Sequence, residues 1–367
     1  MRRIGLSIYP DLSNYEDDQR YLEAGHKLGY TRVFTSLLQL SGDAESGTLA
    51  KFKRTIKCAN DLGYQVIVDI NPGLFKDLGV TYDDLHFFAD LGVWGLRLDE
   101  GFTGLEEARM TRNPYGLKIE INMSAGTNYL ASILSYHPLR DNLLGCHNFY
   151  PQEYTGLSER YFMQYSQPYR DANLHTAAFV SSHVAQTGPW PVHEGLPTME
   201  ADRDLPIGTQ VQHLLLTGMI DDVIIGNAYA SNRELELVAQ NFFSSQPLLG
   251  VRLRSDVTAV ERAIVLDGVN GVHLYRGDAS EYMLRSTQTR ITHSGDAIPA
   301  RPSTGDFQRG DVLVVNDDYA RYKGEMQIAL RSFRNDGRRN VVGHIVDSDA
   351  GLLQYIKPWQ TFKLIEQ

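Results

Sequence analysis

Short apolar runs alternate with helix-like stretches along the first two-thirds of the chain. The runs are rich in Val, Ile and Phe, and each precedes a segment whose apolar positions have helical spacing. Eight such runs cover residues 4–10, 31–37, 64–72, 93–102, 117–124, 142–151, 174–182 and 221–231. About eight strand–helix units in roughly 245 residues are typical of a TIM barrel. The pattern therefore predicts an α/β fold with a (β/α)8 barrel.

The ends of three predicted helices support this interpretation. Each ends in Leu-Gly directly before the next strand, at Gly29, Gly63 and Gly92. Glycine suits the C-terminal end of a helix because it adopts left-handed backbone angles without strain. An open, doubly wound sheet is the alternative. No G-x-G-x-x-G sequence follows the first strand, so dinucleotide binding has no support.

The pattern changes after about residue 245. The segments 251–268, 273–287, 311–330 and 340–347 are typical of β-strands joined by turns with Gly, Asn and Asp, with one short helix expected near residues 351–359. We therefore predict a barrel domain over residues 1–245 and a smaller, mostly β domain over residues 246–367. No long linker separates them, so we expect the two domains to pack together.

Composition adds limits on the function. A net charge of −10 argues against nucleic acid or an anionic membrane surface as partner. The two cysteines, Cys58 and Cys146, give neither a disulfide framework nor a Cys-rich zinc site. No signal peptide is recognisable, and no window is apolar over the length of a membrane span. We expect a cytoplasmic protein, for which an oligomer is possible but not indicated.

Charged residues stand at the end of the fourth apolar run, VWGLRLDEGF (93–102). Because side chains alternate along a strand, Leu96 and Leu98 are expected to face the helices. The same alternation turns Arg97 and Asp99 into the barrel. Burying a charge is costly unless it is paired or used. The run therefore predicts a polar cavity inside the barrel at this strand end.

Neighbouring strands supply further charges to the same end of the barrel. Alternation in 64–72 and 117–124 turns Asp69 and Glu120 inward. Active sites of TIM barrels lie at the C-terminal ends of the strands, so these carboxylates are expected to meet Asp99 there. Arg97 and Lys118 are expected one layer below, as counter-ions.

Two carboxylates across a polar cleft are the groups that glycoside hydrolysis requires. One must stay protonated to donate to the leaving oxygen, and the other must be ionised. We assign this pair to Asp99 and Glu120. The competing interpretation is a structural layer of ion pairs, Arg97 with Asp99 and Lys118 with Glu120.

Two other chemistries remain open. A metal-dependent isomerase acting on a small phosphosugar would need a ligand cluster, but no H-x-H or H-E-x-x-H spacing is present. An aldolase would need a nucleophilic lysine such as Lys118. A non-catalytic sugar-binding protein is the third alternative. We predict no metal and no cofactor. The potential metal ligands are His147, His175, His183, Asp69 and Glu120.

The segment 181–204 is too long for a plain connection. Loops of this length are usually functional or disordered. This one contains Trp190 among several prolines and glycines, which favours an ordered loop. An aromatic side chain near a cleft suits stacking on a sugar ring, and the competing interpretation is a lid that only packs.

Several dispersed motifs together resemble one family. The chain is similar to the MupG-type 6-phospho-N-acetylmuramidases, bacterial cytoplasmic glycosidases with a TIM barrel and a C-terminal cyclophilin-like β domain. The resemblance implies hydrolysis of the β-1,4 bond of N-acetylmuramic acid 6-phosphate–N-acetylglucosamine during peptidoglycan recycling. The motifs are IGLSIYP (4–10), RLDEGF (97–102), KIEINMS (118–124), HNFYP (147–151), TGLS (155–158), GLPTME (195–200) and NDDYARYKGEMQIAL (316–330).

Such a substrate brings a phosphate and a lactyl carboxylate, which need cations or N–H donors. Arg233, Arg301 and Arg309 are further candidate cations. Gln152 and Glu153 stand where a basic residue is expected after HNFYP, so this loop lacks support as a phosphate site. We expect substrate contacts from Asp69, Arg97, Asn122, Asn148, Tyr150, Thr198, Glu200, Arg203 and Arg321.

Overall fold

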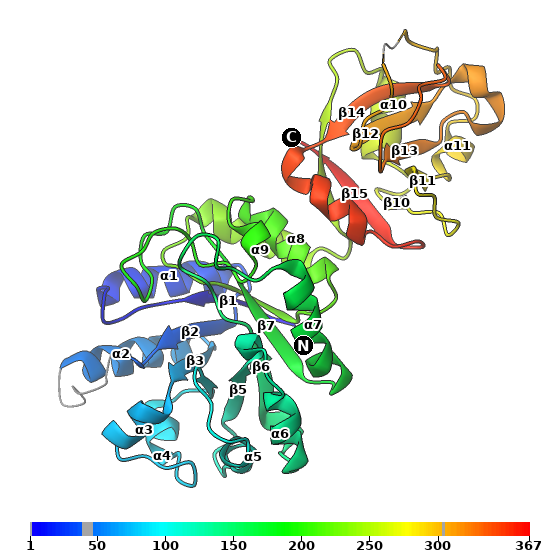
Figure 1. Ribbon diagram of the computed structural model, residues 1–367. Coiled ribbons are helices and arrows are strands. Elements are labelled where there is room, and N and C mark those ends of the chain that lie inside the picture. Colours follow the sequence, from blue (N-terminus) through cyan, green and yellow to red (C-terminus); the bar gives the residue numbers. More distant parts are fainter. Residues whose placement is uncertain (1, 39–46, 303–304) are drawn as a thin grey trace. The chain divides into compact units, whose positions relative to one another are not determined.

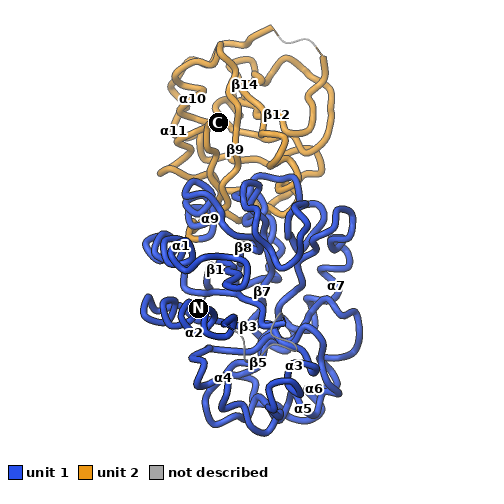
Figure 2. Tube along the Cα trace, turned by 90° about the vertical axis from the view of Figure 1, so that its left-hand side faces the viewer, with its two compact units in different colours: residues 1–242 blue, residues 243–367 orange. Residues whose placement is uncertain are grey.

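In a computed structural model the chain forms two compact units, residues 1–242 (unit 1) and 243–367 (unit 2) (Figure 2). The structure describes residues 2–38, 47–302 and 305–367. Within these ranges, no helix combines the length and the apolar character that a bilayer crossing requires.

Unit 1 is a closed barrel of eight parallel strands with helices around it (Figure 1). Each strand pairs with the next in sequence, and β8 closes the barrel on β1 through the pair Ile4↔Val223. This arrangement confirms the predicted TIM-type fold. The strands are β1 (Ile4–Ser7), β2 (Arg32–Ser36), β3 (Gln65–Ile70), β4 (Gly95–Leu98), β5 (Lys118–Asn122), β6 (Leu143–Cys146), β7 (His175–Val180) and β8 (Asp222–Ile225).

The α-helices of unit 1 follow the strands in order, and the connection from β3 to β4 carries two. Glycine ends three of them as predicted: Gly29, Gly63 and Gly92 have φ angles of 88°, 85° and 81°. The helices are α1 (Tyr15–Lys27), α2 (Gly47–Asp61), α3 (Pro72–Asp77), α4 (His86–Leu91), α5 (Leu105–Met110), α6 (Tyr129–Ser135), α7 (Glu159–Asp171), α8 (Ile207–Leu216) and α9 (Asn232–Phe243).

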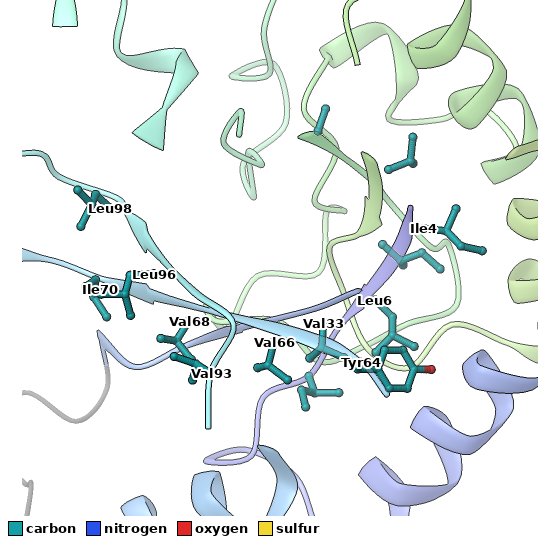
Figure 3. Packing of buried hydrophobic residues seen from close by; sticks show 14 of the residues in the cluster. Ile4, Leu6, Val33, Tyr64, Val66, Val68, Ile70, Val93, Leu96 and Leu98 are labelled. Carbon is teal, nitrogen blue, oxygen red and sulfur yellow. The ribbon is translucent and has the colours of Figure 1, made fainter. Parts of the chain in front are cut away.

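Strand alternation sorts the barrel side chains as the sequence predicts. Leu96 and Leu98 of β4 are fully buried in the same apolar cluster as Val66 and Val68 of β3 (Figure 3). Helix residues such as Phe52 belong to this cluster, which therefore forms the layer between strands and helices. The intervening residues of each strand consequently point into the barrel.

Unit 2 is a mixed seven-stranded sheet with the order β10-β15-β9-β14-β12-β13-β11. Its likeness to the cyclophilin fold stays a prediction. The elements are β9 (Leu248–Leu253), α10 (Ala259–Leu266), β10 (His273–Leu274), β11 (Met283–Ser286), α11 (Thr289–Thr292), β12 (Asp311–Val315), η5 (Asp317–Tyr322), β13 (Met326–Ala329), β14 (Arg339–Ile345), η6 (Asp347–Tyr355) and β15 (Thr361–Glu366).

One prediction for unit 2 is wrong. The pattern predicts strands throughout 251–268, but residues 259–266 form helix α10. The cause is a capping box, in which Thr258 accepts from the backbone N–H of Glu261 while the Glu261 carboxylate accepts from the backbone N–H of Thr258. The helix expected near 351–359 is present as the 3-10 helix η6.

Candidate active site

Arg97 joins two carboxylates at the mouth of the barrel. Its Nη1 lies 2.7 Å from Asp69 Oδ1 and 3.4 Å from Asp99 Oδ1. Its Nη2 donates to the Asn148 side-chain oxygen from the end of β6. The side chains of Arg97 and Asp69 are almost fully buried, whereas that of Asp99 is 40% exposed. The ends of β3, β4 and β6 therefore meet on one guanidinium, and Arg97, Asp69 and Asp99 point inward as the sequence predicts.

This cluster forms the floor of a cavity of about 200 Å³. Its polar residues come from the ends of β2, β3, β4 and β6, and its apolar residues come from the loops after β2, β6 and β7. The apolar wall suits contact with the face of a sugar ring, and the polar floor suits hydrogen bonds to the hydroxyl groups at its edge. The lining residues are Ser36, Leu38, Asp69, Arg97, Asp99, Asn148, Phe149, Pro151, Pro189 and Trp190.

The charges of the floor do not balance. One guanidinium serves two carboxylates, and burial disfavours the ionised form of the more enclosed one. Burial raises the pKa of Asp69 to about 7, against the attraction of Arg97 and with a further contribution from the charge of Asp99. Asp69 can consequently hold a proton near neutral pH, and Asp99 is the more solvent-exposed of the two.

Backbone contacts fix the strand ends that carry these groups. Asn122 donates from Nδ2 to the carbonyl of Asp99 over 3.2 Å, and its Oδ1 accepts from the backbone N–H of Ser124. The Ser124 hydroxyl accepts from the backbone N–H of Asn148 over 3.0 Å. Asn122 therefore supports the position of Asp99 through the backbone, and it is absent from the cavity lining.

The loop after β6 is joined to the loop after β7. The backbone N–H of Tyr150 donates to the carbonyl of Pro197 over 3.0 Å. Thr198, which is fully buried, donates to the carbonyl of Asn148 and accepts from the backbone N–H of Phe179, each over 2.9 Å. These contacts assign Thr198 to the support of the cavity wall.

Glu200 and Arg203 form a clamp on the same two loops. Arg203 pairs with both Glu200 oxygens over 2.7 and 2.8 Å and donates to the carbonyls of Tyr150 and Glu194. Glu200 also accepts from the backbone N–H of Gly156 over 2.7 Å. The Arg203 side chain is only 5% exposed. Both residues, predicted as substrate contacts, use their polar groups within the protein.

Glu120 lies in a second cluster, deeper in the barrel. Its fully buried carboxylate pairs with Arg32 of β2, and Arg32 Nη1 lies 2.9 Å from Asp222 Oδ2. Arg3 and His175 also contact Asp222, over 3.2 and 2.7 Å. Glu120 is therefore held in a sealed ion-pair network and is absent from the cavity lining.

The expected counter-ion of Glu120 was Lys118, and this pairing is wrong. Lys118 is the first residue of β5, at the opposite end of the barrel from the cavity, and its Nζ donates to Asn142 Oδ1 over 2.7 Å. The counter-ion of Glu120 is Arg32 instead. Lys118 also lies far from the strand ends where a Schiff-base lysine would have to meet the cavity.

The three histidines considered as metal ligands lie in different environments. His147 contacts Ser166 of α7 over 2.8 Å, His175 contacts Asp222, and His183 contacts the carbonyl of Arg203. Within residues 2–38, 47–302 and 305–367, no three His, Cys, Asp or Glu side chains gather as candidate metal ligands.

The remaining candidate cations have varied surroundings. Arg233 is largely exposed and pairs with Glu236, and Arg301 pairs with the buried Glu261. Arg309 donates to two backbone carbonyls of unit 2. Arg321 is an exposed residue of η5 in unit 2. Arg97 is the single cation among the described residues that line the cavity.

Sequence reasoning missed Arg32 and most of the apolar cavity wall. Arg32 had a detectable signal, because it opens an otherwise uncharged strand, RVFTS. Phe149, Pro151 and Pro189 had no such signal in the sequence, because loop conformation rather than strand alternation turns them toward the cavity. Trp190 lines the cavity, and its stacking role remains a prediction.

Comparison with known proteins identifies the family. Models described as 6-phospho-N-acetylmuramidase match residues 4–240 (N-terminal) and 247–365 (C-terminal). A solved structure of an uncharacterized B. cereus protein shares 43% identity, with 100% of this chain and 99% of that chain covered and a TM-score of 0.90. A conserved Enterococcus faecalis protein of unknown function shares 26% identity, with coverage of 100% and 96% and a TM-score of 0.76. The comparison with curated proteins found no match.

Both family matches agree with the resemblance found in the sequence motifs, and together they span nearly the whole chain. The chain belongs to the 6-phospho-N-acetylmuramidase family, whose members are glycosidases.

Proposed function

We propose that this protein hydrolyses the β-1,4 bond of N-acetylmuramic acid 6-phosphate–N-acetylglucosamine in the cytoplasm, as a step of peptidoglycan recycling. Family membership supports the substrate. The observation that carries the chemistry is the shared contact of Asp69 and Asp99 with Arg97 on the cavity floor. A carboxyl group that holds its proton beside one that is ionised is the pair that glycosidases use.

In this proposal Asp69 is the general acid and Asp99 is the nucleophile. Asp69 replaces Glu120 in the pair that the sequence suggested, because Glu120 is sealed on Arg32. Asp69 donates its proton to the glycosidic oxygen as the bond to the anomeric carbon breaks. Asp99 attacks that carbon and forms an ester, which water hydrolyses while Asp69 takes the proton back.

The separation of the carboxylates supports retention of the anomeric configuration. Both bound oxygens lie on Arg97 Nη1, which keeps them within about 6 Å of each other. Carboxyl groups about 5 to 5.5 Å apart accompany retention, and wider pairs leave room for the water of an inverting enzyme.

The cavity volume supports a limited contact with the disaccharide. Pockets that enclose drug-sized ligands measure about 300–1,000 Å³, and this cavity is smaller. We therefore place one sugar ring in the cavity, against Trp190 and Phe149, and the other ring outside. The scissile oxygen then lies near the carboxylates of the floor.

The test uses paired aryl β-N-acetylmuramides with and without the 6-phosphate. We expect the wild-type protein to cleave the phosphorylated compound and to leave the other nearly untouched. NMR of the product formed first should show the β-anomer before it mutarotates. Cleavage of neither compound would refute the proposed activity, and initial release of the α-anomer would refute the nucleophilic role of Asp99.

A further inference from the structure

The motif NDDYARYKGEMQIAL (316–330) has no part in the barrel cavity. It forms η5, with Tyr319 and Tyr322, and strand β13 of unit 2. Its buried polar residues include Glu325 with no exposed surface and Gln327 with 3%. Buried polar groups need partners, and the partners of these two indicate what the motif builds.

Three arginines converge on this pair of side chains. Arg285 of β11 donates to both Glu325 oxygens, over 2.7 and 3.1 Å, and Arg290 of α11 lies 3.7 Å from Glu325 Oε2. Arg339 of β14 donates to Gln327 Oε1 over 2.8 Å, and Gln327 donates to Glu325 over 2.9 Å. Arg339 also pairs with Asp336 over 3.0 Å, so three guanidinium groups meet two carboxylates, which leaves one positive charge in excess.

Tyrosine rings join the arginines into one surface. The rings of Tyr319 and Tyr322 contact each other with centroids 4.9 Å apart. The guanidinium of Arg290 lies over Tyr322 at 5.7 Å, and that of Arg339 lies over Tyr319 at 5.9 Å. Such contacts hold an arginine in place without using its N–H groups.

Several of these N–H groups have no acceptor within the part of the chain that the structure describes. Arg290 makes no hydrogen bond there, Arg285 uses Nε and Nη2 only, and Arg339 uses Nε and Nη1. Their side chains are 30%, 22% and 14% exposed, respectively. The guanidinium groups are therefore held in place and half-buried, and they can still donate hydrogen bonds to a ligand.

Unit 2 differs from unit 1 in charge. Residues 243–367 carry 16 Lys and Arg against 15 Asp and Glu, whereas residues 1–242 carry 19 against 30. Thirteen of the 16 cations in unit 2 are arginines, which match phosphate oxygens with paired N–H donors. An anion is therefore attracted to unit 2 more readily than to the acidic unit 1.

We propose that Arg285, Arg290 and Arg339 form an anion-binding site in unit 2 that takes the phosphate of a sugar phosphate. The guanidinium groups bind the phosphate oxygens, and the tyrosine surface contacts the sugar ring. The anion site stands on the geometry of unit 2 alone. The choice of N-acetylmuramic acid 6-phosphate as its ligand rests on the proposed function.

The experiment compares Arg290→Gln with Arg254→Gln. The Arg290 side chain makes no hydrogen bond to any described residue, so its replacement removes none of those. Arg254 is an exposed arginine of unit 2 that pairs with Asp256. The two variants remove the same charge from the same unit. Calorimetric titrations use inorganic phosphate, N-acetylmuramic acid 6-phosphate and N-acetylmuramic acid, with thermal unfolding as the test of folding.

We expect the 6-phosphate sugar to bind more tightly than inorganic phosphate, and the unphosphorylated sugar to bind weakly. Arg290→Gln should weaken both phosphate ligands by about tenfold or more, as loss of a charged hydrogen bond does. Arg254→Gln should leave them unchanged, and Arg290→Lys, which keeps the charge, should lie between.

Equal effects of Arg290→Gln and Arg254→Gln would overturn the anion site. Arg290-dependent binding of inorganic phosphate, with no tighter binding of the sugar phosphate, would overturn the sugar assignment. Neither readout requires hydrolysis. Arg290-dependent binding in a protein that cleaves no muramide would refute the proposed activity and support this site.

Discussion

The barrel contains two arginines that each hold two carboxylates, and the two clusters differ in charge balance. Arg32 lies between Glu120 and Asp222, and Arg3 and His175 add further donors to Asp222. Arg97 lies between Asp69 and Asp99, and the Asn148 side chain that it also contacts is neutral. The deep cluster therefore has enough cations for its carboxylates, and the cluster at the mouth does not.

The pKa shifts of the carboxyl groups follow this difference. Burial alone would raise the pKa of Asp222, but the hydrogen bond from His175 and the charge of Arg32 outweigh it and lower that pKa. Burial of Asp69 is opposed mainly by the single Arg97, and the pKa rises to about 7. The number of cations per carboxylate thus separates a structural ion-pair network from a group that can exchange protons.

The largest effect is expected from Asp99→Asn. An amide cannot form the covalent intermediate, so kcat/KM for the phosphorylated aryl muramide should fall by about 10³-fold or more. Asp99 is partly exposed, so the free energy of unfolding should change little. Activity within tenfold of the wild type in a folded variant would remove Asp99 from the mechanism.

The second effect concerns Asp69 and pH. A general acid acts in its protonated form, so kcat/KM should decline as the pH rises through about 7. Asp69→Asn should lower activity on the natural disaccharide by about 10²- to 10⁴-fold and abolish this decline. The measurement is a pH profile of both proteins from pH 5 to 9. A decline that persists in Asp69→Asn would assign it to another group.

Glu120→Gln tests the deep cluster. Removing one partner of a buried pair leaves Arg32 with too little negative charge, so we expect a loss of about 3 kcal/mol in the free energy of unfolding. Urea denaturation measures it, with Asp222→Asn as the matched variant on the other side of Arg32. We expect the protein that stays folded to keep kcat/KM within about tenfold of the wild type, because Glu120 does not line the cavity.

The result for Glu120→Gln also decides between the two assignments of the acid–base pair. A folded Glu120→Gln protein as inactive as Asp99→Asn would restore Glu120 to the catalytic pair that the strand pattern suggested. It would also show that a balanced, sealed cluster can take part in catalysis, which contradicts the distinction drawn from charge.

The smallest effect is expected at the cavity wall. Trp190→Ala removes an aromatic surface but no charge, so KM should rise by about two- to tenfold with kcat nearly unchanged. Trp359→Ala, an exposed tryptophan of unit 2, is the matched control and should change neither constant. A fall in kcat as large as that of Asp69→Asn would mean that the wall positions the reacting bond.

The sequence predicts the barrel and its inward charges because both depend on local periodicity. Alternation along β4 is sufficient to turn Arg97 and Asp99 inward. The partner of Glu120 depends instead on which strand lies across the barrel, and Arg32 is 88 residues away along the chain. Strand alternation carries no such information, and it led to the neighbouring Lys118.

The sequence did not indicate what the side chains of the loop after β7 contact, for a different reason. Thr198 and Glu200 belong to the motif GLPTME (195–200), Arg203 follows it, and all three lie beside the cavity wall. Motif position indicates importance but does not say whether a polar side chain serves the substrate or the backbone. Only the contacts of Arg203 with four loop carbonyls show that it serves the backbone.

The clamp of Arg203 and Glu200 has a consequence for the rate of substrate entry. It ties the loop that carries Phe149 to the loop that carries Trp190 before any ligand arrives. The loops are then already ordered in the folded protein, so substrate binding does not include the entropic cost of ordering them. Association should therefore occur in one kinetic phase, with a rate proportional to substrate concentration.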